Sequence, residues 1–105
     1  MSKSPVHALV ALGAILAVTP AFANQELAQK NNCLACHAVA NKVVGPAYKD
    51  VAAKYKGQKD AEATLVVNIK KGGSGKWGQV PMPPQTTLGD ADATALAKWI
   101  LSQAK

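Results

Sequence analysis

The pentapeptide Cys33-Leu34-Ala35-Cys36-His37 has the pattern C-x-x-C-H, which is typical of covalent attachment of a c-type haem. On a helix, Cys33 and Cys36 share one face because they are three residues apart. Their sulfurs can then form thioether bonds with the two vinyl groups along one side of a porphyrin. His37 lies on the same face, from which its imidazole can reach the iron as the proximal ligand. The motif therefore predicts one covalent haem, attached at Cys33 and Cys36 and ligated by His37.

Three other chemistries use two cysteines at this spacing. A structural zinc ion needs four ligands, whereas the chain beyond residue 23 offers two Cys and one His. A redox dithiol would follow a β-strand, whereas residues 25–30 (QELAQK) favour a helix. A structural disulfide, common in exported proteins, is the simplest alternative to haem attachment.

The N-terminus has the features of a secretory signal peptide. A basic start at Lys3 precedes an apolar run of thirteen positions, residues 6–18, which only His7 and Gly13 interrupt. Small residues stand at −3 and −1 of a cut after Ala23. Because a membrane span needs roughly twenty apolar residues, an uncleaved anchor is the weaker interpretation. We expect residues 1–23 to be cleaved, residues 24–105 to form one domain, and the mature protein to be periplasmic.

The mature chain is small and basic. Its 82 residues are marginal for a self-sufficient core, so we expect covalent haem to hold the fold together and the chain without haem to be largely unfolded. All twelve basic residues are Lys, and the mature net charge is about +5. Export and the absence of Arg argue against nucleic acid as a partner. The charge serves either solubility or steering toward acidic partners.

Apolar spacing predicts four helices, over residues 25–36, 47–56, 61–71 and from 89 or 90 nearly to 105. Asn24 and Asp60 are candidate N-caps, and Pro46 suits a first helical turn. The second and fourth helices have inner faces at the usual i, i+3, i+4 and i+7 spacing, made by Tyr48, Val51, Ala52 and Tyr55 and by Ala93, Leu96, Ala97 and Ile100. The inner face of the third helix is made by Ala61, Leu65, Val66 and Ile69. No alternating pattern indicates a strand, so the predicted class is all-α.

The segment 72–84 is rich in Gly and Pro and is predicted to be an irregular loop. It contains Met82, the single Met of the mature chain, between Pro81 and Pro83. Prolines reduce the entropy lost when a loop is held in one shape, and thioether sulfur is a soft ligand that suits haem iron. We therefore expect Met82 to be the second axial ligand. Core packing is the simpler role for a Met, and water or a Lys are the competing ligands.

Several stretches together resemble the class I c-type cytochromes, and among them the small bacterial cytochrome c-551 type. Besides residues 33–37, they are Val44-Gly45-Pro46-Ala47-Tyr48, Gly75-Lys76-Trp77-Gly78, Val80-Pro81-Met82-Pro83-Pro84 and Leu96-Ala97-Lys98-Trp99-Ile100-Leu101. The resemblance spans residues 24–105. It implies a small cytochrome c fold of about four to five short helices wrapped around one covalent haem.

The resemblance also implies roles for individual residues. His37 and Met82 would be the axial ligands, and the carbonyl of Pro46 would accept the Nδ1–H of His37. Trp77 would donate its indole N–H to a haem propionate, with simple packing as the alternative. Where the family has an Asn that hydrogen-bonds the ligand sulfur, this chain has Gln85.

These features predict a soluble, monomeric electron carrier rather than an enzyme. With both axial positions filled, the iron can change valence but has no site for a substrate. The resemblance implies a quinol-oxidising complex as donor and a nitrite reductase or terminal oxidase as acceptor, met through acidic docking patches. A haem enzyme or gas sensor would need an open iron and a distal acid or base, and a dithiol exchange protein would keep free thiols.

Overall fold

Four α-helices and one 3₁₀ turn make up the secondary structure in the computed structural model, which describes residues 20–104. They are α1 (Pro20–Lys30), η1 (Cys33–Ala35), α2 (Tyr48–Tyr55), α3 (Ala61–Lys71) and α4 (Asp90–Leu101). Within these residues the only β structure is two isolated bridges, so the predicted all-α class is confirmed. None of the described helices is long and apolar enough to cross a membrane. Most of the predicted signal peptide, residues 1–19, lies outside the described residues.

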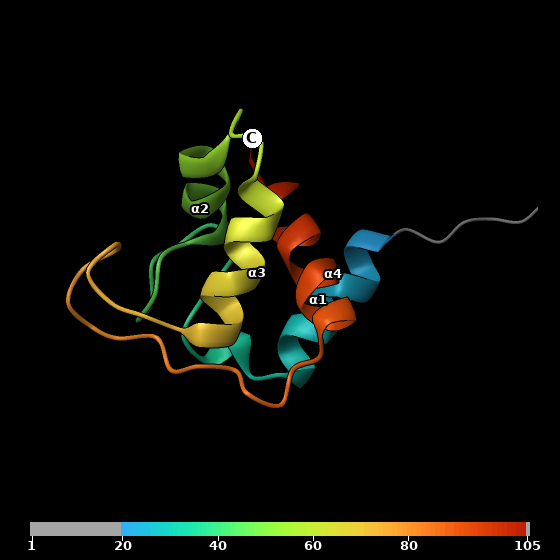
Figure 1. The fold of residues 1–105 in the computed structure, drawn as a ribbon, viewed down its shortest axis with the longest axis horizontal. Coiled ribbons are helices and arrows are strands. Elements are labelled where there is room, and N and C mark those ends of the chain that lie inside the picture. The colour runs from blue at the N-terminus through green and yellow to red at the C-terminus, as the bar shows by residue number, and fades with distance from the viewer. Residues whose placement is uncertain (1–19, 105) are drawn as a thin grey trace, which may run out of the picture.

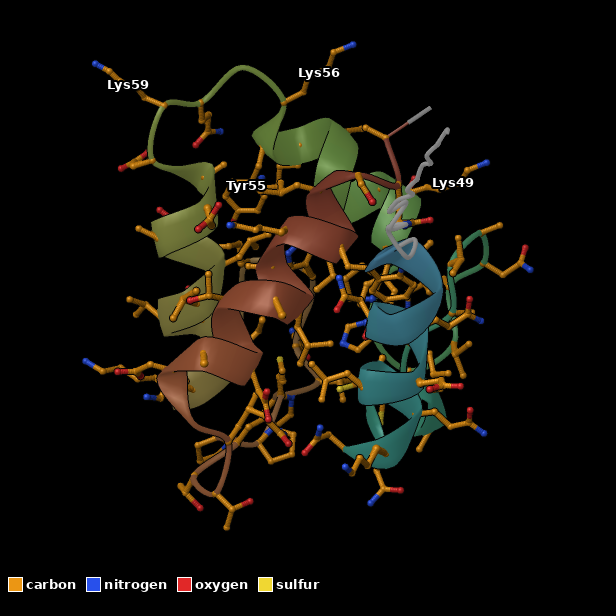
Figure 2. All side chains as sticks on the ribbon, turned by 90° about the vertical axis from the view of Figure 1, so that its right-hand side faces the viewer. Lys49, Tyr55, Lys56 and Lys59 are labelled. Carbon is orange, nitrogen blue, oxygen red and sulfur yellow. The ribbon has the colours of Figure 1, made fainter. Side chains whose placement is uncertain are left out.

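Helix α4 is the centre of the packing, since it contacts α1, α2 and α3 (Figure 1). The predicted inner faces of α2 and α4 are buried throughout, and so are Ala61, Leu65 and Ile69 on α3, whereas Val66 is half-buried. Trp99 of α4 is also buried and meets Tyr48 edge-to-face, with ring centroids 5.2 Å apart. Tyr55 points inward while Lys49, Lys56 and Lys59 point outward (Figure 2). Apolar burial along α4 therefore brings the three other helices together.

The predicted first helix, residues 25–36, was wrong at both ends. Helix α1 begins at Pro20, so Asn24 lies inside it and is not its N-cap. It stops at Lys30 because Asn32 adopts a left-handed conformation (φ 62°), which Asn tolerates better than most residues. The side chain of Asn31 also donates to the carbonyl of Leu27 at 2.9 Å. The motif at residues 33–37 consequently begins on a separate 3₁₀ turn.

Three other predictions of helix ends need correction. The side chain of Asp60 makes no capping hydrogen bond, although the residue occupies the N-cap position of α3. Pro46 lies two residues before α2 rather than in its first turn. Helix α4 ends at Leu101 instead of continuing nearly to residue 105, because the Ser102 hydroxyl bonds the Trp99 carbonyl at 2.6 Å. Local polar side chains thus compete with helix continuation.

The loop between α3 and α4 runs around one side of the molecule (Figure 1). Its two ends are joined by an ion pair between Lys70, in the last turn of α3, and Asp90, the first residue of α4. Near the α3 end, Met82 and Gly73 form an isolated antiparallel bridge. The helices and this loop together enclose the site described next.

Candidate functional site

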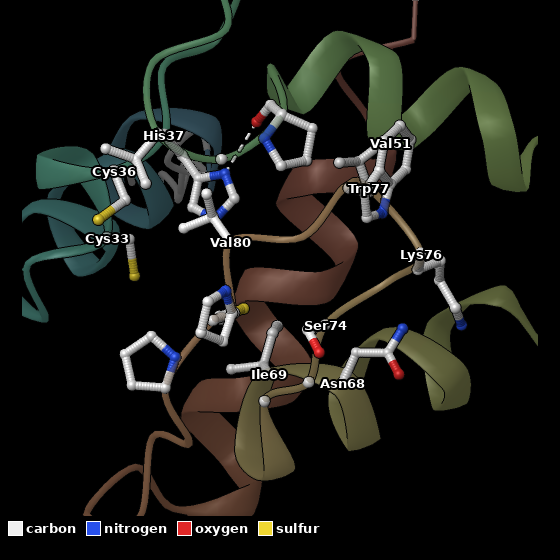
Figure 3. Close-up of a pocket in the computed structure, with 18 of the residues that line it drawn as sticks. Cys33, Cys36, His37, Val51, Asn68, Ile69, Ser74, Lys76, Trp77 and Val80 are labelled. Atoms are coloured by element: carbon white, nitrogen blue, oxygen red, sulfur yellow. Dashed lines mark hydrogen bonds between the residues drawn. The ribbon is translucent and has the colours of Figure 1, made fainter.

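A cavity of about 660 Å³ lies between the motif, α2, α3, α4 and the loop after α3. All six residues that the sequence singled out line it: Cys33, Cys36, His37, Pro46, Trp77 and Met82. Its deeper lining is apolar and comes from Val51, Leu65, Ile69, Leu96 and Ile100. In Figure 3 the two cysteines and His37 lie together on one side, and Ile69, Asn68 and Ser74 lie on another. The volume is within the range of cavities that hold a cofactor.

The imidazole of His37 is fixed in orientation by its neighbours. Its Nδ1–H donates to the carbonyl of Pro46 over 2.8 Å, shown as a dashed line in Figure 3. Because that carbonyl can only accept, Nε2 keeps its lone pair for a metal. The ring also stacks on Tyr48, with centroids 4.9 Å apart and planes 18° from parallel. A Cβ on Gly45 would come within 2.5 Å of Cε1 of His37, so only glycine allows this close approach.

The 3₁₀ turn places the two cysteines on one side of the chain. In a 3₁₀ helix residues i and i+3 eclipse one another, and the amides of Cys36 and His37 both bond the carbonyl of Cys33, at 3.1 and 2.9 Å. Neither cysteine forms a disulfide. Burial raises the pKa of the Cys33 thiol, and a hydrogen bond with Tyr48 opposes this shift. Burial likewise raises the pKa of Tyr48.

Met82 is held through its backbone rather than by its flanking prolines alone. Its amide donates to the carbonyl of Gly73 at 2.8 Å, and its own carbonyl accepts from the Gly73 amide at 3.0 Å. Gly72 has a φ of 66°, and a Cβ there would stand 2.3 Å from the Met82 carbonyl oxygen. The side-chain amide of Gln85 donates to the carbonyl of Pro83 at 3.0 Å. The end of α3 thus sets the position of Met82.

Trp77 lies at the rim of the cavity and is 39% exposed. The ammonium of Lys54 on α2 sits 5.3 Å from the centroid of its ring. Sequence reasoning missed this contact, the stacking of Tyr48 on His37 and the pairing of Gly73 with Met82. Only the third of these contacts left a signal in the sequence. That signal is the pair of adjacent glycines at positions 72 and 73, which predicted no more than the end of a helix.

These donors and this cavity fit a covalent haem. The site combines two free thiols on one side of a turn, an imidazole with an available Nε2 and a large apolar space. A structural zinc site would need a fourth protein ligand and would have no need of the apolar space. A family model described as "Cytochrome c" matches residues 23–104. The chain belongs to the cytochrome c family.

Relatives place it among the small bacterial members of the cytochrome c family. It is 56% identical over 92 residues to cytochrome c-552 of Nitrosomonas europaea, covering 88% of this chain and 89% of the relative. It is 52% identical over 104 residues to cytochrome c-551 of Pseudomonas aeruginosa, covering 98% and 99%. The crystal structure of the wild-type Nitrosomonas europaea cytochrome c552 superposes with a TM-score of 0.73 at 60% identity, covering 74% of this chain and 96% of that one.

Membership in the cytochrome c family and the similarity to these relatives confirm three predictions. The chain is a small class I c-type cytochrome, it has the predicted small all-α fold, and its cofactor is one covalent haem c. The general function of an electron carrier follows from the same relatives. The individual roles of the six site residues remain predictions.

Replacing Gly72 by Ala is expected to displace the Met82 loop. A Cβ at this position meets the Met82 carbonyl at 2.3 Å and also requires a strained positive φ, so we expect a loss of about 1–3 kcal/mol in the free energy of unfolding. The long-wavelength sulfur-to-iron band of the oxidised protein should weaken as well. Gly57→Ala is the matched control, because Gly57 has a φ of 83° with no atom within 4 Å of a Cβ. Equal effects of the two variants on the band would contradict the role given to Gly72.

Proposed function

We propose that this protein is a periplasmic electron carrier whose haem iron is held by His37 on one side and Met82 on the other. The observation that carries the proposal is that both side chains line one cavity although 45 residues separate them. Each is also fixed independently, His37 by the Pro46 carbonyl and Met82 by the Gly73 backbone.

The chain's own residues favour electron transfer over catalysis. Haem supplies a one-electron exchange between ferric and ferrous iron. Bound to the iron, His37 and Met82 would keep water and substrates away from the metal. Residues 24–105 contain no second His and no Arg that could act as a distal acid or base. This sequence feature disfavours a peroxide-activating or gas-binding role.

The rim of the cavity supports docking with an acidic redox protein. Val44 and Val80 line the cavity and are 47% and 63% exposed, and Lys42 and Lys76 line the same cavity. Exposed apolar residues beside lysines suit brief contacts, in which charge guides the approach and a small apolar area makes the contact. We propose a quinol-oxidising complex as donor and a nitrite reductase or terminal oxidase as acceptor.

Neutralising the rim lysines is expected to slow reaction with anionic partners. The double variant K42Q/K76Q should reduce anionic hexacyanoferrate(III) several-fold more slowly at low salt, with little difference from wild type at 1 M salt, where the Debye length is only about 3 Å. Stopped-flow mixing measures the rate. The control K59Q/K98Q removes the same charge at two exposed positions that do not line the cavity. An equal slowing in the control would show that net charge, not the rim, steers the reaction.

Export can be tested separately from redox function. We propose that residues 1–23 are removed, which would cut α1 after its fourth residue and leave Asn24 as the new N-terminus. Intact-mass and N-terminal analysis of protein from the periplasmic fraction should show a chain of 82 residues plus one haem. A full-length chain retained in the membrane fraction would contradict this assignment.

The function itself is tested by redox titration of the haem-loaded protein made with haem-maturation factors. We expect one reversible one-electron wave, and a ferric form that binds added cyanide only slowly because Met82 must first leave. Immediate cyanide binding, or turnover of peroxide at an enzymatic rate, would contradict the proposal.

A further inference from the structure

The tip of the loop that carries Trp77 has few ties to the rest of the fold. The amide of Gly75 donates to the carbonyl of Gly78 at 2.7 Å, which closes a turn with Lys76 and Trp77 at its tip. A Cβ on Gly75 or Gly78 would meet no atom within 4 Å, so the backbone of the turn stands clear of other elements. In the described part of the chain, no hydrogen bond joins residues 74–81 to a helix. Side chains must therefore hold this tip in place.

Trp77 makes the contact with α2 that can do so. The Nζ of Lys54 lies 5.3 Å from the centroid of the Trp77 ring, inside the distance of about 6 Å at which an ammonium is attracted to an indole face. Val51, three residues earlier on α2, lines the same cavity as Trp77, and both are labelled in Figure 3. Val51 is buried and lines the cavity, whereas Lys54 is exposed. The recorded contact between the indole and α2 is therefore the one with the ammonium of Lys54.

We propose that Lys54 is a positioning residue, whose ammonium holds the Trp77 indole against α2 and keeps the loop tip closed over this rim of the cavity. The attraction between an exposed ammonium and an indole corresponds to roughly a two- to fivefold change in the ratio of closed to open loop. When the loop opens, water enters beside the haem and the indole N–H of Trp77 moves away from the rim. The proposal rests on the proposed function only in taking the haem as the occupant of the cavity.

Hydrogen exchange in the reduced, haem-loaded protein measures the opening, since exposed groups exchange in proportion to the open population. We expect Lys54→Gln and Lys54→Met to speed exchange of the Trp77 indole N–H and of the amides of residues 76–79 by roughly two- to fivefold. Lys54→Arg should keep the wild-type rates, because a guanidinium also stacks on an indole. Lys59→Gln is the control, since it removes the same charge from the connection between α2 and α3.

Three results would overturn the proposal. Wild-type exchange rates in Lys54→Met would show that an aliphatic side chain is sufficient to hold the Trp77 indole against α2. Rapid exchange in Lys54→Arg would show that a positive charge at this position does not hold the indole. Equal acceleration in Lys59→Gln would point to net charge. The absorption spectrum of each variant reports Met82 ligation separately, so a failure of the His37–Met82 assignment is distinguishable from a failure of the Lys54 assignment.

Discussion

A chain produced without haem is expected to lose most of its helical circular dichroism and its cooperative unfolding transition. The cavity measures about 660 Å³ and is bordered by core residues of α2, α3 and α4. Without haem, water would fill this cavity and would face apolar side chains such as Leu65, Leu96 and Ile100. A mature chain of 82 residues has little other burial to offset that loss, because domains of this size are only marginally stable. The folded apo chain should therefore be sparsely populated.

Matched preparations of residues 24–105 with and without haem test this prediction by far-ultraviolet circular dichroism and urea titration. The haem-loaded form serves as the control, because its sequence is identical. An apo chain that unfolds cooperatively at the same urea concentration would show that the four helices are stable by themselves, and the haem would then not be part of the core.

Replacing Met82 by Ala is expected to remove the sulfur ligand and change the electronic state of the iron. The oxidised variant should lose its long-wavelength sulfur-to-iron band and acquire a high-spin spectrum, and cyanide should bind at once. Its reduction potential should fall by a substantial part of the roughly 0.8 V range that axial ligands cover, because Met ligation raises the potential.

The control for this variant is Val80→Ala, which shortens an exposed side chain two residues away in the same loop. It should keep the band, the low-spin spectrum and a potential close to that of the wild type. A Met82→Ala protein that is also low-spin with an unchanged potential would show that another group, such as a Lys, is the native sixth ligand.

Much of the site was predictable because it depends on local sequence. The spacing within residues 33–37 requires its two thiols and imidazole to be neighbours in any turn of the chain. The faces of α2 and α4 follow from apolar periodicity, and all their predicted inner residues are buried. Met82 was a candidate ligand because no other Met remains after residue 23 and because prolines flank it, and its role as a ligand stays a prediction.

What the sequence did not reveal depends on contacts between distant residues or on competition at helix ends. The break at Asn32 requires a left-handed residue that a helical pattern does not predict. The roles of Gly45 and Gly72 come from approaches to His37 and to the Met82 carbonyl, and periodicity carries no information about either. In the sequence, Lys54 cannot be distinguished from any other solvent-exposed lysine. Only the fold shows that Trp77 lies beside it.

X-ray absorption at the iron edge of the oxidised, haem-loaded protein examines the iron ligands most directly. If His37 and Met82 both bind the metal, the first shell contains five nitrogens and one sulfur, and the sulfur disappears in Met82→Ala. A shell of nitrogen and oxygen alone in the wild-type protein would contradict the assignment.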